Sequence, residues 1–308
     1  MAKKEIITRW KSTAENDRAS ERIFNICNHG GVLSVDQSPF GRMDNGLVDF
    51  RGYRASGIMV KDVVAKDCDF SCADFSNCWL EANRFENCRF EHTDFTNSSD
   101  HGNTFEGCVF IGCKFKLASL GYKGSNFRNC HFEECGFQRA NFVRVEFVGT
   151  DFVNCRLKGV DFFGSSFDNC KFEGVLEDVW FRGTFPSDMD IDDFGKPKTN
   201  KMFNVSFEDA ELIDLTISDG CDLSTVKLKN SGRYVKFDHW LKRLQFLERN
   251  LSNWDNEQFK LEASRFVRVS MVHAQKQDWK IISLDDLEKH YGSGDIARKI
   301  IDVLSEVN

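Results

Sequence analysis

Large apolar side chains, most of them phenylalanine, recur at every fifth position through the middle of this chain. Side chains on one face of a helix recur every 3.6 residues and those on one face of a strand every 2, so neither element alone produces this period. A backbone that turns a corner once in every five residues does produce it, and four such sides close into a square coil. The sequence therefore predicts a solenoid of stacked coils.

The five-residue register holds over two runs. The first run has eleven centres from Phe70 to Leu120, and the second has ten from Phe127 to Phe172 after a slip of two residues. A small residue usually stands two positions before the centre, so each unit is expected to point one large and one small side chain inward. Coils would then stack through backbone hydrogen bonds about 4.8 Å apart. The predicted core includes Phe70, Phe90, Phe110, Phe132, Phe152, Phe172, Cys68, Cys88, Cys108, Cys130 and Cys170.

Several units, such as CADFSN, RANFVR and GVDFFG, closely match the pattern A(D/N)LxX. On these motifs the chain resembles the pentapeptide-repeat family from about residue 60 to residue 181. The resemblance implies a mainly β fold, a right-handed quadrilateral β-helix. Asp100 departs from the pattern because it replaces an apolar centre. That corner is expected to be open, strained or filled by a neighbouring side chain.

Three segments follow from where the period starts and stops. The β-helix is predicted over residues 46–232, with an irregular beginning at 46–65. Residues 1–45 are expected to cap the first coil and to include a helix over 14–26. Residues 233–308 are expected to form a mostly helical domain, which either covers the last coil or makes a homodimer.

Helical signals fill the C-terminal segment. Ser283 precedes Asp286 by three residues, which is typical of a helix start, and YGSGD from Tyr291 is expected to end one helix and begin another. The segment SRFVRVSMV is ambiguous between helix and strand. Residues expected on one face of a first helix are Phe237, Trp240, Leu241, Leu244, Leu247 and Leu251.

The twelve cysteines are expected to pack rather than to bind metal or form disulfides. No apolar run follows the first residues and no segment is apolar enough to span a membrane, so we expect a cytoplasmic protein with reduced thiols. Ten of the twelve cysteines occupy the small inward position. The tight pair Cys68 and Cys72 would place one thiol inside and the other outside, which does not suit zinc. Cys27 and Cys72 are the two candidates for reactive thiols.

Motifs for catalysis or nucleotide binding are absent from the sequence. GKPKTN lacks the order of residues that cradles phosphates, and no G-x-S-x-G occurs. The seven histidines are scattered, and His92, His101 and His131 are expected on coil surfaces. The sequence therefore predicts a protein that is not an enzyme and has no cofactor.

One insertion interrupts the solenoid at residues 183–201 and holds four aspartates. Asp188, Asp190 and Asp192 match the start of a calcium loop, but Asp193 stands where that loop needs glycine. Three interpretations remain open: a calcium site, a solvated insertion of no consequence, or a partner-binding loop formed by these four aspartates.

Charge is concentrated in the predicted β-helix, which has 21 Lys and Arg against 30 Asp and Glu, a net charge of −9. An acidic surface argues against direct nucleic-acid binding and favours basic grooves on proteins. The family resemblance implies more, because some members look like B-DNA in width and charge and bind type II topoisomerases. The partner would then be DNA gyrase or topoisomerase IV. The alternative is a rigid scaffold or effector-like protein whose C-terminal domain carries the partner site.

Overall fold

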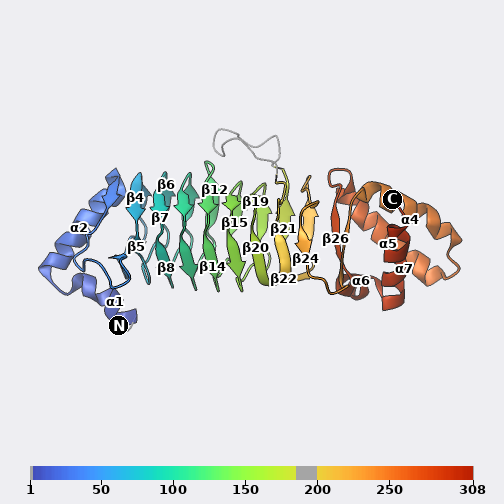
Figure 1. Cartoon of the computed structure of the whole chain (residues 1–308), viewed down its shortest axis with the longest axis horizontal. Helices are drawn as coiled ribbons and strands as arrows, with labels where there is room; N and C mark the ends of the chain where they lie inside the picture. The colour runs from blue at the N-terminus through green and yellow to red at the C-terminus, as the bar shows by residue number, and fades with distance from the viewer. Residues whose placement is uncertain (1–2, 185–199, 308) are drawn as a thin grey trace.

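The computed structural model describes residues 3–184 and 200–307 of the chain. Figure 1 shows an elongated rod, with a parallel β-solenoid of about eight turns in the middle and helices at both ends. The N-terminal helices lie at one end of the rod and the C-terminal helices at the other. The fold class expected from the five-residue repeat is therefore confirmed.

Each coil has four sides, so the solenoid has four faces, which we number in chain order. Strands of successive coils pair in parallel on three of these faces. The first face consists of β1 (Gly31–Leu33), β4 (Val63–Lys66), β7 (Arg84–Glu86), β10 (Thr104–Glu106), β13 (Asn126–Arg128), β16 (Glu146–Val148) and β19 (Ser166–Asp168). The second consists of β2 (Val48–Asp49), β5 (Cys68–Asp69), β8 (Arg89–Glu91), β11 (Val109–Ile111), β14 (His131–Glu133), β17 (Asp151–Val153), β20 (Lys171–Glu177), β22 (Ser206–Ile213) and β24 (Lys227–Leu228).

The two remaining faces complete the square. The third face is a row of single parallel bridges that joins Arg54, Asp74, Asp94, Lys114, Gly136 and Arg156 in order. The fourth consists of β3 (Met59–Lys61), β6 (Trp79–Glu81), β9 (Ser99–His101), β12 (Ser119–Tyr122), β15 (Asn141–Val143), β18 (Asp161–Phe163), β21 (Trp180–Arg182) and β23 (Thr216–Ser218). Pairing already begins at β1, upstream of residue 46.

Phenylalanine rings stack along the axis and form most of the core. On the second face, the ring centroids of Phe90 and Phe110 are 4.8 Å apart, and those of Phe110 and Phe132 are 4.5 Å apart. This spacing matches the distance between hydrogen-bonded strands, because each ring sits directly over its counterpart in the previous coil. All eleven predicted core phenylalanines and cysteines are buried.

The slip of two residues between the runs is absorbed on the fourth face. The pairing of β12 with β9 shifts register between Ser119 and Tyr122. Gly121 has a positive φ of 101°, and a Cβ there would stand 2.2 Å from the carbonyl oxygen of Val143. Only glycine fits this position, because any side chain would collide with the backbone of the next coil.

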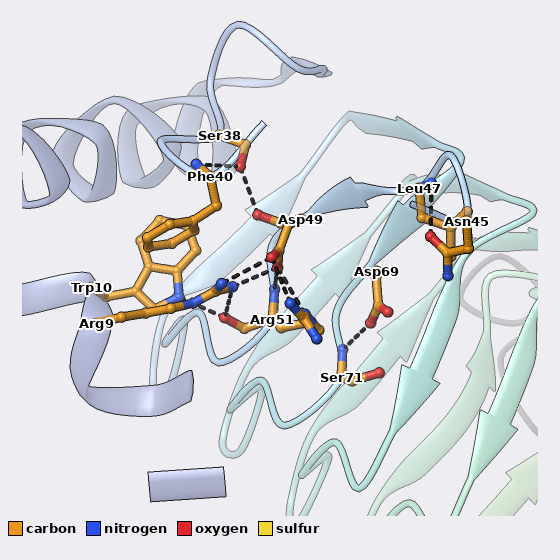
Figure 2. A network of polar contacts seen from close by, with 10 residues as sticks. All are labelled: Arg9, Trp10, Ser38, Phe40, Asn45, Leu47, Asp49, Arg51, Asp69 and Ser71. Carbon is orange, nitrogen blue, oxygen red and sulfur yellow. Dashed lines mark hydrogen bonds and ion pairs between the residues drawn. The ribbon is translucent and has the colours of Figure 1, made fainter. Parts of the chain in front are cut away.

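The N-terminal helices are clamped onto the first coil by an ion pair (Figure 2). They are α1 (Lys3–Thr8), a short 3₁₀ turn over Arg9–Lys11, and α2 (Ala14–His29). The guanidinium of Arg9 donates to the carboxylate of Asp49 at 2.8 Å, and the indole nitrogen of Trp10 donates to the carbonyl of Arg51 at 2.7 Å. Arg9 also lies 3.7 Å from the centre of the Phe40 ring. The salt bridges to Arg9 and Arg51 lower the pKa of Asp49 although burial opposes them.

At the other end, a two-stranded antiparallel sheet separates the last coil from the helices. It pairs β25 (Tyr234–Phe237) with β26 (Lys280–Ser283). The helical elements are α4 (Trp240–Asn250), a 3₁₀ turn over Leu251–Asn253, α5 (Glu257–Ala274), α6 (Leu284–Tyr291) and α7 (Gly294–Ser305). Gln277 joins this region to the solenoid, since its side chain accepts from the backbone of Gly220 and Cys221 at 3.0 and 2.9 Å.

Several local expectations for this region can be checked. The ambiguous segment SRFVRVSMV is helical and lies within α5. The hydroxyl of Ser283 accepts from the backbone nitrogen of Asp286, as the capping motif predicted. Placing Phe237 on the first helix was wrong, because this residue ends β25 and the helix begins at Trp240.

Candidate functional site

The interior of the solenoid is filled by buried side chains that pack against one another and form hydrogen bonds. The thiols of its buried cysteines point at backbone carbonyls of the preceding coil, as with Cys108 and Phe85 at 3.4 Å. Burial raises the pKa of Cys170 to about 12. Cys27 is also buried, and burial raises its pKa to about 12, which disfavours the reactive thiolate. Cys72 is only partly buried.

Asp100 is the polar exception inside the core. It is completely buried, and its carboxylate accepts from the backbone nitrogen of Gly121 at 2.9 Å and from the side-chain amide of Asn103. Burial raises its pKa to about 6, against the opposing effect of these hydrogen bonds. The coil closes around the carboxyl group rather than opening, and Asp100 itself occupies the corner with hydrogen bonds from Gly121 and Asn103.

The three histidines expected on coil surfaces do not gather into one site, whereas His273 and His290 line the junction cleft described below. His92 is exposed, with 55% of its side chain accessible, and His131 is partly exposed. The expectation for His101 was wrong, because it is buried between two aromatic rings. Its ring stacks on Trp79 at 3.8 Å and on Tyr122 at 5.2 Å. Tyr122 is its register partner in the following coil, whereas Trp79 lies across from Ser99, two residues before His101.

The insertion leaves and re-enters the solenoid between Gly183 and Asn200, which are joined by a backbone hydrogen bond of 3.1 Å. Asn200 is buried, and its side chain accepts from the backbone nitrogen of Phe167 at 3.2 Å. The four aspartates predicted to bind a partner, Asp188, Asp190, Asp192 and Asp193, lie outside the described residues. The calcium and partner-binding interpretations therefore both stay predictions.

Charge on the solenoid is segregated by coil, which the net value for the whole β-helix conceals. Residues 46–110, the N-terminal acidic coils, have eleven acidic and six basic residues. Residues 111–160, the basic band, have four acidic and eight basic residues. Residues 161–184 and 200–232, the C-terminal acidic coils, have eleven acidic and five basic residues. A count for each coil would have found this pattern in the sequence.

A cleft of about 510 Å³ lies where the solenoid meets the C-terminal helices. Trp180 and Ile217 line it from the last coils, Phe266 from α5, Lys280 from β26 and Asp286 from α6. Burial lowers the pKa of Lys280 and raises that of Asp286. The cleft is thus largely apolar with a few charged groups, which is typical of small binding sites at domain junctions.

The outer side of α5 extends this cleft with exposed apolar side chains. Val269 and Val272, both at its mouth, are 53% and 72% exposed, and Leu261 is 63% exposed. Their spacing places all three on one side of the helix. Exposed apolar side chains of this kind beside a cleft are typical of a protein contact.

Within the described residues, no group of His, Cys, Asp or Glu side chains is arranged to hold a metal ion. None of the helices in that part of the chain is both long and apolar enough to cross a bilayer.

Comparison with known proteins agrees with the repeat. Residues 103–179 match the sequence model of a family described as a pentapeptide repeat region, whereas no curated protein matches the chain by sequence. Full-length QnrB1, a plasmid-mediated fluoroquinolone resistance protein, aligns with 18% identity over 58% of this chain and 90% of its own, with a TM-score of 0.30. HetL from the cyanobacterium Nostoc sp. strain PCC 7120, a pentapeptide repeat protein involved in heterocyst differentiation regulation, aligns with 11% identity over 58% and 86% of the two chains, with a TM-score of 0.27.

A pentapeptide repeat protein from the thylakoid lumen of Arabidopsis thaliana aligns with 16% identity over 45% of this chain and 72% of its own, with a TM-score of 0.16. These similarities describe the proteins named and assign no partner to this chain. The five-residue repeat, the family match at its centre and the four-sided parallel coil together identify residues 103–179 as a pentapeptide repeat region within a longer β-solenoid.

Proposed function

We propose that this protein is a non-catalytic interaction protein whose acidic coils bind a basic surface of a protein partner. The observation that carries the proposal is the acidic excess of the C-terminal coils, eleven acidic against five basic residues. A rigid surface of one charge attracts an oppositely charged groove and speeds its encounter. The family resemblance supplies the leading candidate, a type II topoisomerase such as DNA gyrase or topoisomerase IV.

Three carboxylates of these coils are well suited to contact a partner. Asp178, Glu208 and Glu211 are exposed, and none of them forms an ion pair with another described residue. Their charges are therefore available to a basic partner without first breaking an ion pair, although Glu208 accepts a hydrogen bond of 3.0 Å from the hydroxyl of Ser206. Carboxylates such as Asp161, which is held by Arg182 at 2.8 Å, are less available.

The test is DNA supercoiling by purified gyrase across a titration of this protein, with and without a quinolone. The acidic-coil variant neutralises three charges as Asp178→Asn, Glu208→Gln and Glu211→Gln. The matched control neutralises three exposed carboxylates of the N-terminal segment, Glu21, Asp36 and Asp44. We expect the wild type and the control to change supercoiling or its inhibition, and the acidic-coil variant to need a higher concentration. The topoisomerase proposal is wrong if the wild type changes neither.

The insertion remains part of this proposal. Neutralising Asp188, Asp190, Asp192 and Asp193 together should weaken the same effect if these residues contact the partner. An unchanged titration would remove the insertion from the contact and leave the acidic coils as the binding surface.

A scaffold whose C-terminal domain holds the partner is the second candidate. The exposed apolar side of α5 beside the junction cleft favours it. Affinity capture from native cells separates the two candidates. A partner that is lost when Leu261, Val269 and Val272 are replaced by serine, but retained by the acidic-coil variant, would support the scaffold.

A further inference from the structure

The basic band carries a second charged surface of opposite sign. On the third face, Lys114 and Lys116 lie on one coil, and Arg156 and Lys158 lie two coils further on. Arg139 stands at the corner after the intervening coil. All five side chains are exposed. Because neighbouring coils are about 4.8 Å apart, the two pairs of cations are separated by about 10 Å along the rod.

Three of these cations have no ion-pair partner among the residues that the structure describes. Lys114 contacts Asp94 at 3.7 Å, and Lys158 contacts Glu177 at 2.6 Å. Lys116, Arg139 and Arg156 form no ion pair in the described part of the chain. Free cations on a rigid surface attract an anionic partner, because their positions are fixed before binding.

The coil between the cationic pairs offers a neutral, uncharged centre. Its outward positions are Gly136, which has no side chain, and Gln138. The amide oxygen of Gln138 lies 2.9 Å from where a Cβ of Gly136 would be, so the glutamine side chain folds over the glycine. A carboxylate placed there would be flanked by cations on both sides, with an amide group within reach.

Acidic residues limit the length of what can bind. Asp94 borders the band on one side and Glu177 on the other, while Glu134 stands at the edge towards the second face. Duplex DNA carries one charge per about 1.7 Å of its length, so a duplex along the rod would meet carboxylates within a few base pairs. A short anionic segment, covering about three coils, avoids them.

We propose that the basic band on the third face binds an acidic segment of a protein, rich in Asp and Glu, at a site separate from the acidic coils. This goes beyond the proposed function, which concerns basic partners only. The protein would then hold two partners on one rigid rod, a basic partner on the acidic coils and an acidic partner on the basic band. The charge pattern of the third face, which is acidic, basic and acidic again, favours a short segment over a long polyanion.

The test is fluorescence anisotropy with labelled hexaglutamate as the probe and a peptide of glutamines as its neutral counterpart. The band variant reverses three charges as Lys116→Glu, Arg139→Glu and Arg156→Glu. The matched control reverses Lys201, Lys227 and Lys229, which are exposed residues of the C-terminal acidic coils. Both variants change the net charge equally, so a difference between them reports position rather than total charge.

We expect the wild type and the control to bind hexaglutamate with an affinity that falls as salt rises, and the band variant to bind about tenfold more weakly. Thermal unfolding followed by circular dichroism checks that both variants are folded. We expect this result because the substituted positions are exposed. The proposal is overturned if the wild type does not bind the probe, or if both variants lose affinity equally. Tighter binding of duplex DNA than of the peptide would also overturn it.

Sedimentation velocity separates a foreign partner from a second copy of the chain. We expect the wild type and the band variant to sediment alike. Self-association of the wild type that the band variant abolishes would show that the acidic coils of another copy occupy the band, and the proposal of a foreign acidic partner would be wrong.

Discussion

Protonation of Asp100 should control the stability of the solenoid. Its carboxyl group is completely buried, and burial raises its pKa from 3.8 to about 6. The folded state therefore binds this proton more tightly than the unfolded state does. Its contribution to stability is greatest below pH 3.8 and is lost as the pH rises through about 6.

The size of this effect follows from the shift. One pKa unit corresponds to about 1.36 kcal/mol, so ionising Asp100 in the folded state costs up to about 3 kcal/mol. Above about pH 7 the folded and unfolded states are both ionised at this position, and the loss stops growing. Asp100→Asn keeps the shape of the side chain and removes the titration. Asp100→Leu also removes it and restores the apolar centre found at Leu80 and Leu120 in the neighbouring coils.

Equilibrium urea unfolding from about pH 4 to about pH 8 measures this difference. The free energy of unfolding of the wild type, minus that of either variant, should fall by about 2.4 kcal/mol over this range, because the unfolded state is already partly ionised at pH 4. A constant offset is expected as well, because each substitution disturbs the hydrogen bonds to Gly121 and Asn103. If the free energies of unfolding of the wild type and the variants differ by the same amount at every pH, the assignment of a raised pKa to this buried carboxyl is refuted.

Three further predictions concern the core, the thiols and the N-terminal clamp. Phe110→Ala should lower the free energy of unfolding by about 3–5 kcal/mol, whereas Arg128→Ala on the outside should change it by less than about half a kcal/mol, and equal urea midpoints would contradict the inward assignment. In brief alkylation followed by mass spectrometry, Cys72 should react before Cys27, whose pKa is raised to about 12 by burial; the reverse order would contradict this. Asp49→Ala should speed hydrogen exchange in α2 while leaving the middle strands protected, and uniform exchange would show that the clamp holds nothing locally.

The repeat could be read from the sequence because each unit places the same kinds of side chain at the same positions. Phe90 and Phe110 differ by one full coil, and their rings stack as that spacing requires. Phe237 could not be placed in this way. Its apolar spacing fits a helix, but pairing with β26, far along the chain, holds it in a strand. Periodicity describes local structure and carries no information about such distant partners.

The environment of single residues was harder to predict than the coil. His101 stands at an outward position, yet it is buried, with its ring stacked between those of Trp79 and Tyr122 in neighbouring coils. Segregation of charge was concealed for a different reason, because a net charge averages over coils of opposite sign. Lys116 and Arg156 are recognised as parts of one basic surface only when the positions of charged residues on the third face are compared.

Binding of the immobilised protein to purified gyrase, measured as association and dissociation rates at increasing salt, tests the proposed function most directly. We expect the wild type to bind with an association rate that falls as salt rises, the acidic-coil variant to associate more slowly, and the band variant to behave as the wild type does. Absence of binding by the wild type, or equal rates for the acidic-coil variant and its matched control, would contradict a contact made through the acidic coils.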